Sequence, residues 1–415
     1  MKNIWIINHY AIPPTMGGLN RHYYFSKYLS KKGYNVKIFT ASKVHNTSIN
    51  MIKDKSLYKE TEIEDVNYTF VKTRNYGSNY IKRILNMFDF PINMVRVSKS
   101  FKRPDIIYTS SPNPLASLAA IFLAKKYGAK LIIEIRDLWP ESFVAYNIIK
   151  RSNPILNFLY AGEKFIYKKA DTLIFTMEGG KDYIIEKGWN KENGGPISVS
   201  KVSHINNGVD LELFNYNKEH FTIMDNDLNN DKYFKVVYAG SIRKVNNVKK
   251  IIDAAEYIKK TGNDNIKFLI YGDGNEKEQL ERYCVENNID NVIFKGFVEK
   301  NKVPYILSKC NLNIMHFEQN DIKKYGASLN KMFEYFASGR PTVSDCEFRY
   351  DLINRYKCGV VVDNANAEQL AEAIVSFFKM RDSEYNNYCE NALIASQDFD
   401  FKSLTDKLEK IILND

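Results

Sequence analysis

The sequence predicts an α/β protein built from two doubly wound domains, and three observations lead to this prediction. With 415 residues, of which 44% are hydrophobic and 26% charged, the chain is typical of a globular protein too long for one ordinary core. Apolar runs of strand length alternate with amphipathic stretches of helix length, as in βαβ units around a parallel sheet. This alternation starts a second time after a polar stretch at residues 215–231.

The first domain is expected over residues 1–205. Residues 4–7 are apolar, have the length of a strand and lack the cleavage site of a signal peptide, so they predict the first strand. Further strands are expected at 35–40, 105–109, 130–135 and 172–176, with helices at 19–32, 115–127 and 156–169. Together these elements complete one doubly wound domain.

A linker rich in Asn and Asp is expected at 206–232, followed by a second domain at 233–395. Strands are expected there at 234–239, 266–271, 292–294, 312–317 and 341–343, with helices at 248–260 and 276–286. Residues 396–415 predict a C-terminal helix that crosses back to the first domain. Ligands of open parallel sheets bind at the carboxyl ends of the strands, so two such sheets facing each other would form one interdomain cleft.

The bulk composition narrows the choice of partners. A net charge of +10 and a pI near 9.0 favour an anionic partner, and nucleic acid, anionic lipid and phosphorylated small molecules all meet that condition. No apolar run approaches the ~18 residues of a membrane-spanning helix. The five cysteines form no C-x-x-C pair, so we expect reduced thiols in a cytoplasmic protein and no zinc site.

A glycine pair follows the first predicted strand. Gly17 and Gly18 precede a helix that starts near Asn20, so free N–H groups there can bind an anion; a plain turn and helix start is the simpler alternative. The segment is not G-x-G-x-x-G, and the turn at 272–274 has Lys277 in place of a third glycine. These departures disfavour a dehydrogenase. The absence of P-loop and H-E-x-x-H motifs disfavours an NTPase and a zinc hydrolase.

Charged side chains crowd the end of the predicted strand at 130–135. The block E-I-R-D-L-W-P-E-S occupies residues 134–142. Charge at the tip of a buried strand is costly unless it meets a ligand or a partner charge, so Arg136 and Asp137 are candidate functional residues, with a structural ion pair as the alternative. Glu141 follows a proline in the first turn of a predicted helix, where a carboxylate also favours the helix dipole.

Residues 325–341 form the most informative segment. Either Ser328 or Asn330 can cap the helix predicted there. Lys331 and Glu334 share one face of that helix, so an i, i+3 salt bridge is one explanation for them. Ligand binding is the other explanation. The helix N-terminus and Lys331 suit a diphosphate, and Glu334 can accept hydrogen bonds from ribose hydroxyls.

Together these motifs resemble glycosyltransferase family 4 over nearly the whole chain. The blocks, in order, are Gly17-Gly18, residues 136–142, Asn207-Gly208-Val209-Asp210 with Phe214, Tyr238-Ala239-Gly240-Ser241, Gly272-Asp273-Gly274, Phe294-Lys295-Gly296 and residues 328–341. Each block alone is weak, and their common order makes the resemblance specific. The R-D-L-W-P-E-S block is similar to the branch that includes N-acetyl-fucosamine transferases of bacterial surface-polysaccharide assembly. The resemblance implies the GT-B fold, in which two Rossmann-like domains face a cleft.

By this resemblance the C-terminal domain binds a nucleotide-sugar donor, with UDP as the family-level expectation. Glu334 matches the second acid of the family's E-x7-E motif and is expected on the donor ribose, whereas Gly326 replaces the first acid. Lys331 and Ser328 lie where donor phosphates are expected. The other donor-binding positions are Gly17, Gly18, Gly240, Arg243, Gly272, Gly296 and Asn330.

Two further positions depart from the family pattern. The usual phosphate-binding Arg and Lys would align with Ser241 and Asn246, which leaves Arg243 or Lys244 as nearby substitutes, and Arg243 is the favoured one. Arg136 stands where many relatives carry a histidine against the donor sugar, and Asp137 is expected to orient Arg136 or the acceptor. The residues expected to bind the acceptor are Asn20, Arg136, Asp137 and Glu141.

The resemblance also implies a retaining reaction without a protein nucleophile, in which the leaving phosphate helps to deprotonate the acceptor hydroxyl. Fixed cations and helix N–H groups can stabilise the charge on that phosphate without a metal ion. Arg243, Lys331 and the amides of Gly17 and Gly18 are the candidates for this role. The expected catalytic residues are Arg136, Asp137, Arg243 and Lys331. Neither a metal nor a cofactor is expected, because the nucleotide sugar is itself a substrate.

A basic, apolar-rich stretch at 80–103, interrupted at Pro91, predicts a helical element at an anionic membrane surface. Core-facing helices with solvated lysines are the alternative. The membrane interpretation makes the acceptor a glycan on a polyprenyl diphosphate at the cytoplasmic face of the membrane, as in O-antigen, capsule or exopolysaccharide assembly. The transferred sugar is expected to be an N-acetylated hexosamine or deoxyhexosamine.

Two other functions compete with glycosyl transfer. A UDP-sugar 2-epimerase shares the two-domain architecture, but it would need carboxylate acid and base groups at the sugar. A basic nucleic-acid-binding protein is disfavoured, because the sequence lacks reader motifs and clustered Lys or Arg with interleaved aromatic residues.

Overall fold

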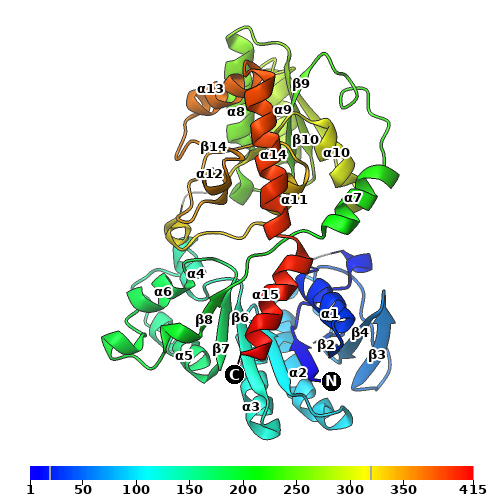
Figure 1. Cartoon of the computed structure of the whole chain (residues 1–415), viewed down its shortest axis with the longest axis vertical. Helices are drawn as coiled ribbons and strands as arrows, with labels where there is room; N and C mark the ends of the chain where they lie inside the picture. Colours follow the sequence, from blue (N-terminus) through cyan, green and yellow to red (C-terminus); the bar gives the residue numbers. More distant parts are fainter. Residues whose placement is uncertain (18–19, 318–319, 415) are drawn as a thin grey trace. The chain divides into compact units, whose positions relative to one another are not determined.

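The chain folds into two compact α/β units, drawn in Figure 1. The computed structural model describes residues 1–17, 20–317 and 320–414. The first unit comprises Met1–Asn206 and the residues from Phe401 onward, and the second comprises Asn207–Asp400. Most of the stretch expected as a linker belongs to the second unit. It contains helix α7 (Leu211–His220), and Phe214 and Leu228 are buried in the core of that unit.

An eight-stranded sheet forms the middle of the first unit. Its strands are β1 (Asn3–Ile7), β2 (Asn35–Ala41), β3 (Tyr58–Ile63), β4 (Val66–Val71), β5 (Ile106–Ser110), β6 (Lys130–Ile135), β7 (Thr172–Phe175) and β8 (Val202–His204). The order is β3-β4-β2-β1-β5-β6-β7-β8, and only the pair β3–β4 is antiparallel. Because the strand order runs outward from β1 in both directions, the topological switch point lies between β1 and β5.

Helices cover both faces of this sheet (Figure 1). They are α1 (Arg21–Lys31), α2 (Tyr80–Val97), α3 (Pro114–Tyr127), α4 (Glu141–Ala145), α5 (Ile155–Lys169), α6 (Gly180–Glu186) and α15 (Phe401–Leu413). Helices α1 and α15 pack on one face, where the rings of Tyr24 and Phe401 stack with centroids 4.6 Å apart. On the other face Trp5 contacts Phe101 and Tyr127. Apolar residues that alternate along β1 therefore serve two cores.

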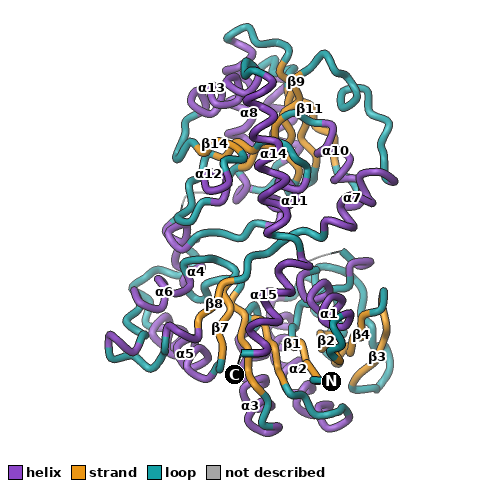
Figure 2. Tube along the Cα trace, in the orientation of Figure 1, coloured by secondary structure: helices purple, strands orange, loops and turns teal. Residues whose placement is uncertain are grey.

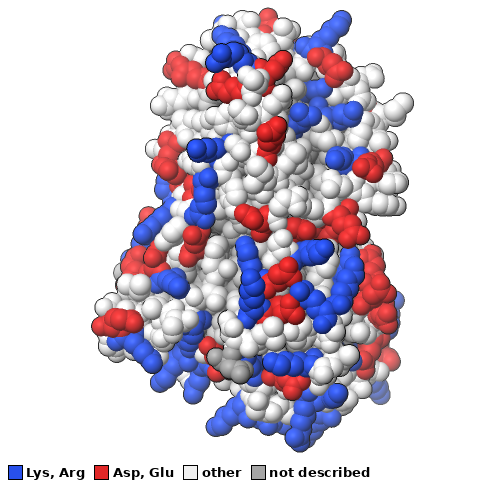
Figure 3. Space-filling model, viewed as in Figure 1, with Lys and Arg blue, Asp and Glu red and all other residues white. Residues whose placement is uncertain are grey.

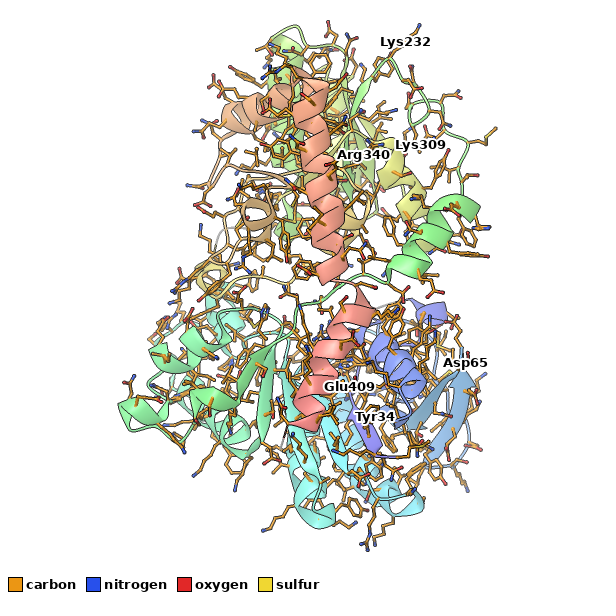
Figure 4. The ribbon with its side chains drawn as sticks, viewed as in Figure 1. Tyr34, Asp65, Lys232, Lys309, Arg340 and Glu409 are labelled. Carbon is orange, nitrogen blue, oxygen red and sulfur yellow. The ribbon has the colours of Figure 1, made fainter. Side chains whose placement is uncertain are left out.

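Polar contacts also hold α15 on α1. Lys32, which follows α1, pairs with Asp406 at 2.8 Å and with Glu409 at 2.6 Å. Glu409 and Tyr34 are labelled in Figure 4, where Glu409 lies on α15 and Tyr34 just beyond α1. The C-terminal segment is thus an integral part of the first unit.

Helix α2 continues through Pro91, contrary to the interruption expected there. A proline cannot donate to the carbonyl four residues earlier, which here belongs to Met87. That carbonyl accepts instead from Asn113 Nδ2 at 3.1 Å. Asn113 also caps α3 by accepting the N–H of Leu115. One side chain therefore satisfies the carbonyl freed by the proline and ties α2 to the start of α3.

A six-stranded, all-parallel sheet forms the middle of the second unit, and Figure 2 shows its strands in orange. The strands are β9 (Phe234–Ala239), β10 (Ile266–Tyr271), β11 (Val292–Gly296), β12 (Leu312–Met315), β13 (Thr342–Ser344) and β14 (Gly359–Val361). Its further helices are α8 (Val248–Lys260), α9 (Lys277–Glu286), α10 (Val303–Lys309), α11 (Asn330–Ala337), α12 (Leu352–Tyr356), α13 (Ala367–Phe378) and α14 (Asp382–Asp398). The order β11-β10-β9-β12-β13-β14 places the switch point between β9 and β12.

Both sheets are doubly wound, so the predicted α/β class is confirmed. Within the described residues, no helix combines the length and the apolar character needed to cross a bilayer. On the face drawn in Figure 3, basic and acidic side chains are interspersed. The net positive charge therefore forms no single field on that face, and any anion recognition there depends on local groups of side chains.

Candidate functional site

Three glycine turns close the carboxyl edge of the sheet in the second unit. Gly240 and Gly272 follow β9 and β10, and Gly296 ends β11. The N–H of Gly240 donates to Tyr271 O at 3.0 Å, and the N–H of Gly272 donates to Gly296 O at 2.8 Å. Gly272 has φ +143°, and a Cβ atom there would lie 1.8 Å from Gly240 O. Only glycine fits at this position, so a ligand can approach the backbone closely.

Helix α11 begins at this same edge without a side-chain cap. Its N-cap is Leu329, so neither Ser328 nor Asn330 caps it, contrary to the expectation. The Ser328 hydroxyl instead accepts the N–H of Asn207 at 2.7 Å. Within the described part of the chain, the N–H groups of Asn330 and Lys331 have no acceptor. The helix therefore keeps free donors, and the positive end of its dipole, at its N-terminus.

Lys331 lies in the first turn of α11, against the end of β9. Its Nζ donates to the Tyr238 hydroxyl at 3.3 Å and lies 4.6 Å from the centroid of the Tyr238 ring. A Cβ atom on Gly240 would be 3.2 Å from the same Nζ. Burial lowers the pKa of Lys331 to about 8, while Glu334 acts in the opposite direction. Among the residues described, no carboxylate lies within salt-bridge distance of Lys331, so the site favours an anionic ligand.

Glu334 lies one turn after Lys331 on α11. Its Oε1 is 3.8 Å from Lys300 Nζ, and the i, i+3 salt bridge to Lys331 that was the alternative explanation is not formed. The Glu334 side chain retains 27% of its exposure. A carboxylate with one distant cationic partner keeps acceptor capacity for the hydroxyl groups of a ligand.

The turn after β9 departs from the family's cationic pattern. Ser241 and Asn246 bond to each other, with Asn246 Nδ2 donating to Ser241 O and Oγ, both at 2.7 Å. Arg243 lies exposed between them, and its guanidinium has no hydrogen-bond or ion-pair partner within the described chain. Gly326 follows a 3-10 turn (Asp321–Tyr325) with φ +84°, so its position offers backbone and no carboxylate.

His316, Asp345 and Lys250 form a cluster that the sequence analysis missed. His316 and Asp345 directly follow the neighbouring strands β12 and β13. His316 Nδ1 lies 2.6 Å from Asp345 Oδ2, and Lys250 Nζ lies 2.6 Å from the same oxygen. The buried Nε2 of His316 has no partner among the described residues. A polar residue directly after each of two apolar strands was the available signal, and the pairing needs the sheet order, which local patterns do not give.

Gly17, the first residue of the glycine pair in the first unit, is used differently from the expectation. The N–H of Gly17 donates to Pro14 O at 3.1 Å, so this amide is not directed at a ligand. Gly18 lies outside the described residues. Helix α1 begins at Arg21, and Asn20 is its N-cap residue without a capping bond from its side chain. The buried Asn20 Oδ1 has no partner within the described chain.

Glu134 in β6 is the centre of a buried network in the first unit. Its Oε1 accepts from Arg21 Nε at 2.6 Å, and its Oε2 lies 3.0 Å from both His22 Nε2 and Ser110 Oγ. The Tyr108 hydroxyl also donates to Oε1. Burial by itself raises the pKa of Glu134, but the charges of Arg21 and His22 hold it well below its usual range. A glutamate inside an otherwise apolar strand was the available signal for this network.

Arg136 and Asp137 directly follow β6. Arg136 is half-buried and Asp137 exposed. The backbone N–H of Arg136 donates to Ser111 Oγ at 3.2 Å, and neither side chain has a hydrogen-bond or ion-pair partner in the described part of the chain. The structural ion pair considered as the alternative is therefore not formed, and both charges stay available.

Glu141, in contrast, is fully engaged within the protein. Its Oε1 accepts from Arg151 Nη2 at 2.8 Å, and its Oε2 accepts from the Tyr160 hydroxyl and from Lys187 Nζ, both at 2.5 Å. Burial by itself raises the pKa of Glu141. The hydrogen bonds from Lys187 and Tyr160 outweigh this effect, so its pKa lies below the usual value. Glu141 ties α4 to α5 and to the end of α6. Glu141 therefore has a structural role, and the acceptor contact expected for it stays a prediction.

Two family models together match most of the chain. The model described as Glycosyltransferase Family 4 matches residues 16–213, and the model described as Glycosyl transferases group 1 matches residues 220–394. The chain belongs to glycosyltransferase family 4. The family inferred from the sequence motifs is thereby confirmed. A curated relative of this family 4 chain, the probable glycosyltransferase WbjE of Pseudomonas aeruginosa, is 20% identical over 226 residues. That match spans about half the length of either protein, 54% of each.

Solved structures show the same fold over the whole family 4 chain. Alr3699/HepE from Anabaena, in complex with UDP, has a TM-score of 0.67 at 15% identity and covers 99% of both chains. The UDP-forming α,α-trehalose-phosphate synthase from Burkholderia vietnamiensis has a TM-score of 0.70 at 12% identity, covering 99% of this chain and 100% of the synthase. At these identities the likeness concerns the fold, which is GT-B.

The described residues of the family 4 chain contain no group of three or more His, Cys, Asp or Glu side chains placed to hold a metal ion. Its five cysteines are free thiols, and four of them are buried. Burial raises the pKa of the Cys310 thiol to about 12. Such a thiol stays protonated near neutral pH and is unreactive.

Proposed function

We propose that this chain is a glycosyltransferase that moves a sugar from a nucleotide diphosphate, preferably UDP, to a growing cell-surface glycan. The observation that carries the donor half is the surroundings of Lys331. Among the described residues its ammonium group has no carboxylate at salt-bridge distance, and it lies beside the uncapped start of α11 and the Gly240 turn. A diphosphate supplies the negative charge that this arrangement lacks. Membership of family 4 and the UDP in the HepE complex support a uridine nucleotide.

The proposed reaction breaks the bond between the anomeric carbon and the β-phosphate oxygen and forms a bond to an acceptor hydroxyl. Negative charge grows on the β-phosphate, and Lys331 with the α11 N–H groups stabilises it without a metal ion. Arg243, on the exposed turn after β9, adds a further cation. We propose retention of the anomeric configuration, with the leaving phosphate accepting the hydroxyl proton, so that no protein nucleophile is needed.

Glu334 is the proposed contact for the donor ribose. Its distant pairing with Lys300 leaves acceptor capacity for two hydroxyl groups. Gly326 contributes no carboxylate to the donor sugar, so other groups at this edge must select that sugar. We propose an N-acetylated hexosamine or deoxyhexosamine, in keeping with the similarity of the R-D-L-W-P-E-S block to aminosugar transferases.

Incubation with UDP-, GDP- and dTDP-sugars tests the donor half. We expect UDP and UDP-sugars to raise the melting temperature, and Lys331→Met to weaken UDP binding by about tenfold or more. Lys309→Met is the matched control, because Lys309 is an exposed lysine of the same unit on α10, labelled in Figure 4. Equal UDP affinity in the two variants would contradict the proposal. A free epimerised sugar nucleotide formed without an acceptor would instead indicate the 2-epimerase.

For the acceptor half, we propose a lipid-linked glycan at an anionic membrane surface. Ile81, Leu85, Phe88 and Ile92 are exposed and recur at i, i+4, i+7 and i+11, so they form one stripe along α2. Helix α3 packs against α2 and adds the exposed Leu118 and Phe122. An apolar stripe with basic residues around it favours the interface of an anionic bilayer.

Sedimentation with lipid vesicles tests this contact. We expect binding to phosphatidylglycerol vesicles, weaker binding to phosphatidylcholine vesicles and a loss of binding as salt is added. Phe88→Ser should weaken binding, whereas Val285→Ser, at an exposed position of the second unit, should not. Unchanged sedimentation of the Phe88 variant would remove the support for a membrane surface on α2.

A further inference from the structure

A second group of cations without a counter-ion lies in the first unit, away from the Glu134 network. Lys43 and His45 follow β2, Tyr10 follows β1 and Tyr76 follows β4, so loops after three neighbouring parallel strands contribute to it. Arg83 joins from the first turn of α2. We call these five residues the loop cluster. Its position at the carboxyl edge of the sheet is where ligands of doubly wound folds bind.

The contacts within the loop cluster are tight. His45 Nδ1 lies 2.9 Å from the Tyr76 hydroxyl, and the rings of Tyr10 and His45 have centroids 4.9 Å apart. Lys43 Nζ lies 5.6 Å from the centroid of the Tyr76 ring. Burial raises the pKa of the Tyr10 hydroxyl, and Arg83 is the charge that acts most strongly against this rise. These relations place both cations around the same pair of tyrosines.

The positive charge of the loop cluster is not neutralised by the protein. Within residues 1–17, 20–317 and 320–414, neither Lys43 nor Arg83 has a carboxylate at salt-bridge distance. Burial lowers the pKa of Lys43, and the pKa of His45 falls through burial and then through the charges of Arg83 and Lys43. The nearby Asp89 is already held by Arg74 through bonds of 2.7 and 2.8 Å. Lys43 is buried and Arg83 is exposed, and the charges of both act on His45 between them, so an anion there would be stabilised by both cations.

The apolar stripe of α2 starts in the same helical turn as Arg83. Successive helix positions are about 100° apart, so Arg83 projects from the opposite side of α2 to Ile81 and Leu85. Asn86, one turn further, lies on the buried side. Its Oδ1 accepts from His9 Nε2 at 2.9 Å, which holds α2 against the loop after β1. An anion-binding group and an exposed apolar surface thus occupy two sides of one short helical segment.

We infer that the loop cluster binds the diphosphate of a lipid-linked acceptor, whose hydrocarbon chain remains in the membrane beside the α2 stripe. Two phosphates supply the counter-charge that no carboxylate of the described residues provides to Lys43 and Arg83. The hydroxyl groups of Tyr10 and Tyr76 can donate to phosphate oxygens. This inference rests on the proposed glycosyl transfer. It assigns the acceptor's anionic group to residues that are distinct from the donor contacts of the second unit.

Binding of farnesyl diphosphate to the full chain, in the presence of saturating UDP, tests the inference. Saturation with UDP removes the donor's own phosphate contacts from the measurement. We expect Arg83→Gln and Lys43→Met each to weaken farnesyl diphosphate binding by about tenfold. Lys82→Gln is the matched control, because Lys82 is the adjacent exposed cation on another side of the same helix, and its affinity should change less than about twofold.

Further ligands separate the sources of the anion. Inorganic pyrophosphate should bind more weakly than farnesyl diphosphate but with the same dependence on Arg83, and farnesol should show no such dependence. Equal effects of Arg83→Gln and Lys82→Gln would overturn the inference, as would competition of UDP with farnesyl diphosphate. An Arg83 effect confined to phosphatidylglycerol vesicles would also overturn it, by assigning the cluster to lipid headgroups. UDP affinity should be equal in Arg83→Gln and the parent protein, and failure of the parent protein to bind UDP would count against the proposed function instead.

Discussion

The two units share a doubly wound sheet, yet two charges near its carboxyl edge, Glu134 in the first unit and Lys331 in the second, are treated in opposite ways. In the first unit Glu134 is buried, and the charge of Arg21 meets its own at 2.6 Å, while His22 Nε2 lies within hydrogen-bond distance. In the second unit no carboxylate of the described chain lies at salt-bridge distance from Lys331, and Glu334 acts on it only from further away. Removing one member of a neutralised buried pair destabilises the fold, whereas a partly buried charge without a partner is itself destabilised until a ligand arrives. This difference separates structural charges from ligand-binding ones better than position along the chain does.

The largest expected effect comes from breaking the neutralised network. Glu134→Gln leaves Arg21 buried without its counter-charge and should lower the free energy of unfolding of the first unit by about 3–5 kcal/mol. Urea unfolding followed by tryptophan fluorescence reports on this unit alone, because Trp5, Trp139 and Trp189 all belong to it.

Glu60→Gln is the control for that experiment, since Glu60 pairs with Lys37 at the exposed surface of the same sheet. It should have little effect. If both substitutions shift the unfolding midpoint equally, Glu134 is not the stabilising centre of the first unit.

The next effect concerns the glycine turns at the carboxyl edge of the sheet in the second unit. Gly272→Ala would place a Cβ atom 1.8 Å from Gly240 O, so the turn beside Lys331 must shift, and UDP affinity should fall by about tenfold or more. Gly262→Ala is the control, because Gly262 also has a positive φ, of +78°, but has open space around its Cβ position. Calorimetric titration with UDP distinguishes the two. Equal affinities would show that the close approach of the two turns is not needed for binding.

Much of the fold was predictable because its signals are local. The alternation of strands and helices was predicted from hydrophobic periodicity, and the family was predicted from ordered short motifs. Both predictions were confirmed. Helix α7 was missed because polar residues such as Asn215 and Asn217 resemble a linker, while the buried Phe214 provides the packing that keeps the helix on the second unit. Tertiary packing decided between two local states that the sequence leaves close in energy.

The candidate site was less predictable, because charge pairing depends on contacts between distant segments. Glu141 and Asp137 look alike as acids beside one strand end, yet Lys187, 46 residues away in the chain, engages only Glu141. The loop cluster has no motif at all, since three loops and one helix supply its members. Sequence spacing can reveal groups on one element, such as Lys331 and Glu334, but not groups brought together by sheet order.

Measuring UDP affinity over a pH series tests whether Lys331 is the cation that binds the diphosphate. Free Lys331 loses its proton near pH 8, whereas a bound diphosphate would raise its pKa, so the UDP complex holds more protons than the free protein above that pH. UDP affinity should therefore fall as the pH rises from about 8 to about 9, by up to about tenfold.

The Lys331→Arg variant provides the comparison, because a guanidinium keeps its charge over this range. Its UDP affinity should not change between these two pH values. The same pH dependence in both proteins would assign the titration to another group.

The smallest expected effect concerns an added positive charge at the carboxyl edge of the second unit's sheet and its influence on UDP affinity. Asn246 stands where the family usually carries a phosphate-binding lysine, and its exposed bonds to Ser241 contribute little stability. Asn246→Lys should therefore fold normally and raise UDP affinity by about two- to fivefold, with a steeper loss of affinity as salt is added. Asn265→Lys adds the same charge at an exposed position on the α8–β10 connection and should leave UDP affinity unchanged. If both substitutions strengthen binding equally, long-range attraction by net charge is enough to explain the gain. The diphosphate would then not be bound specifically at the edge beside Lys331.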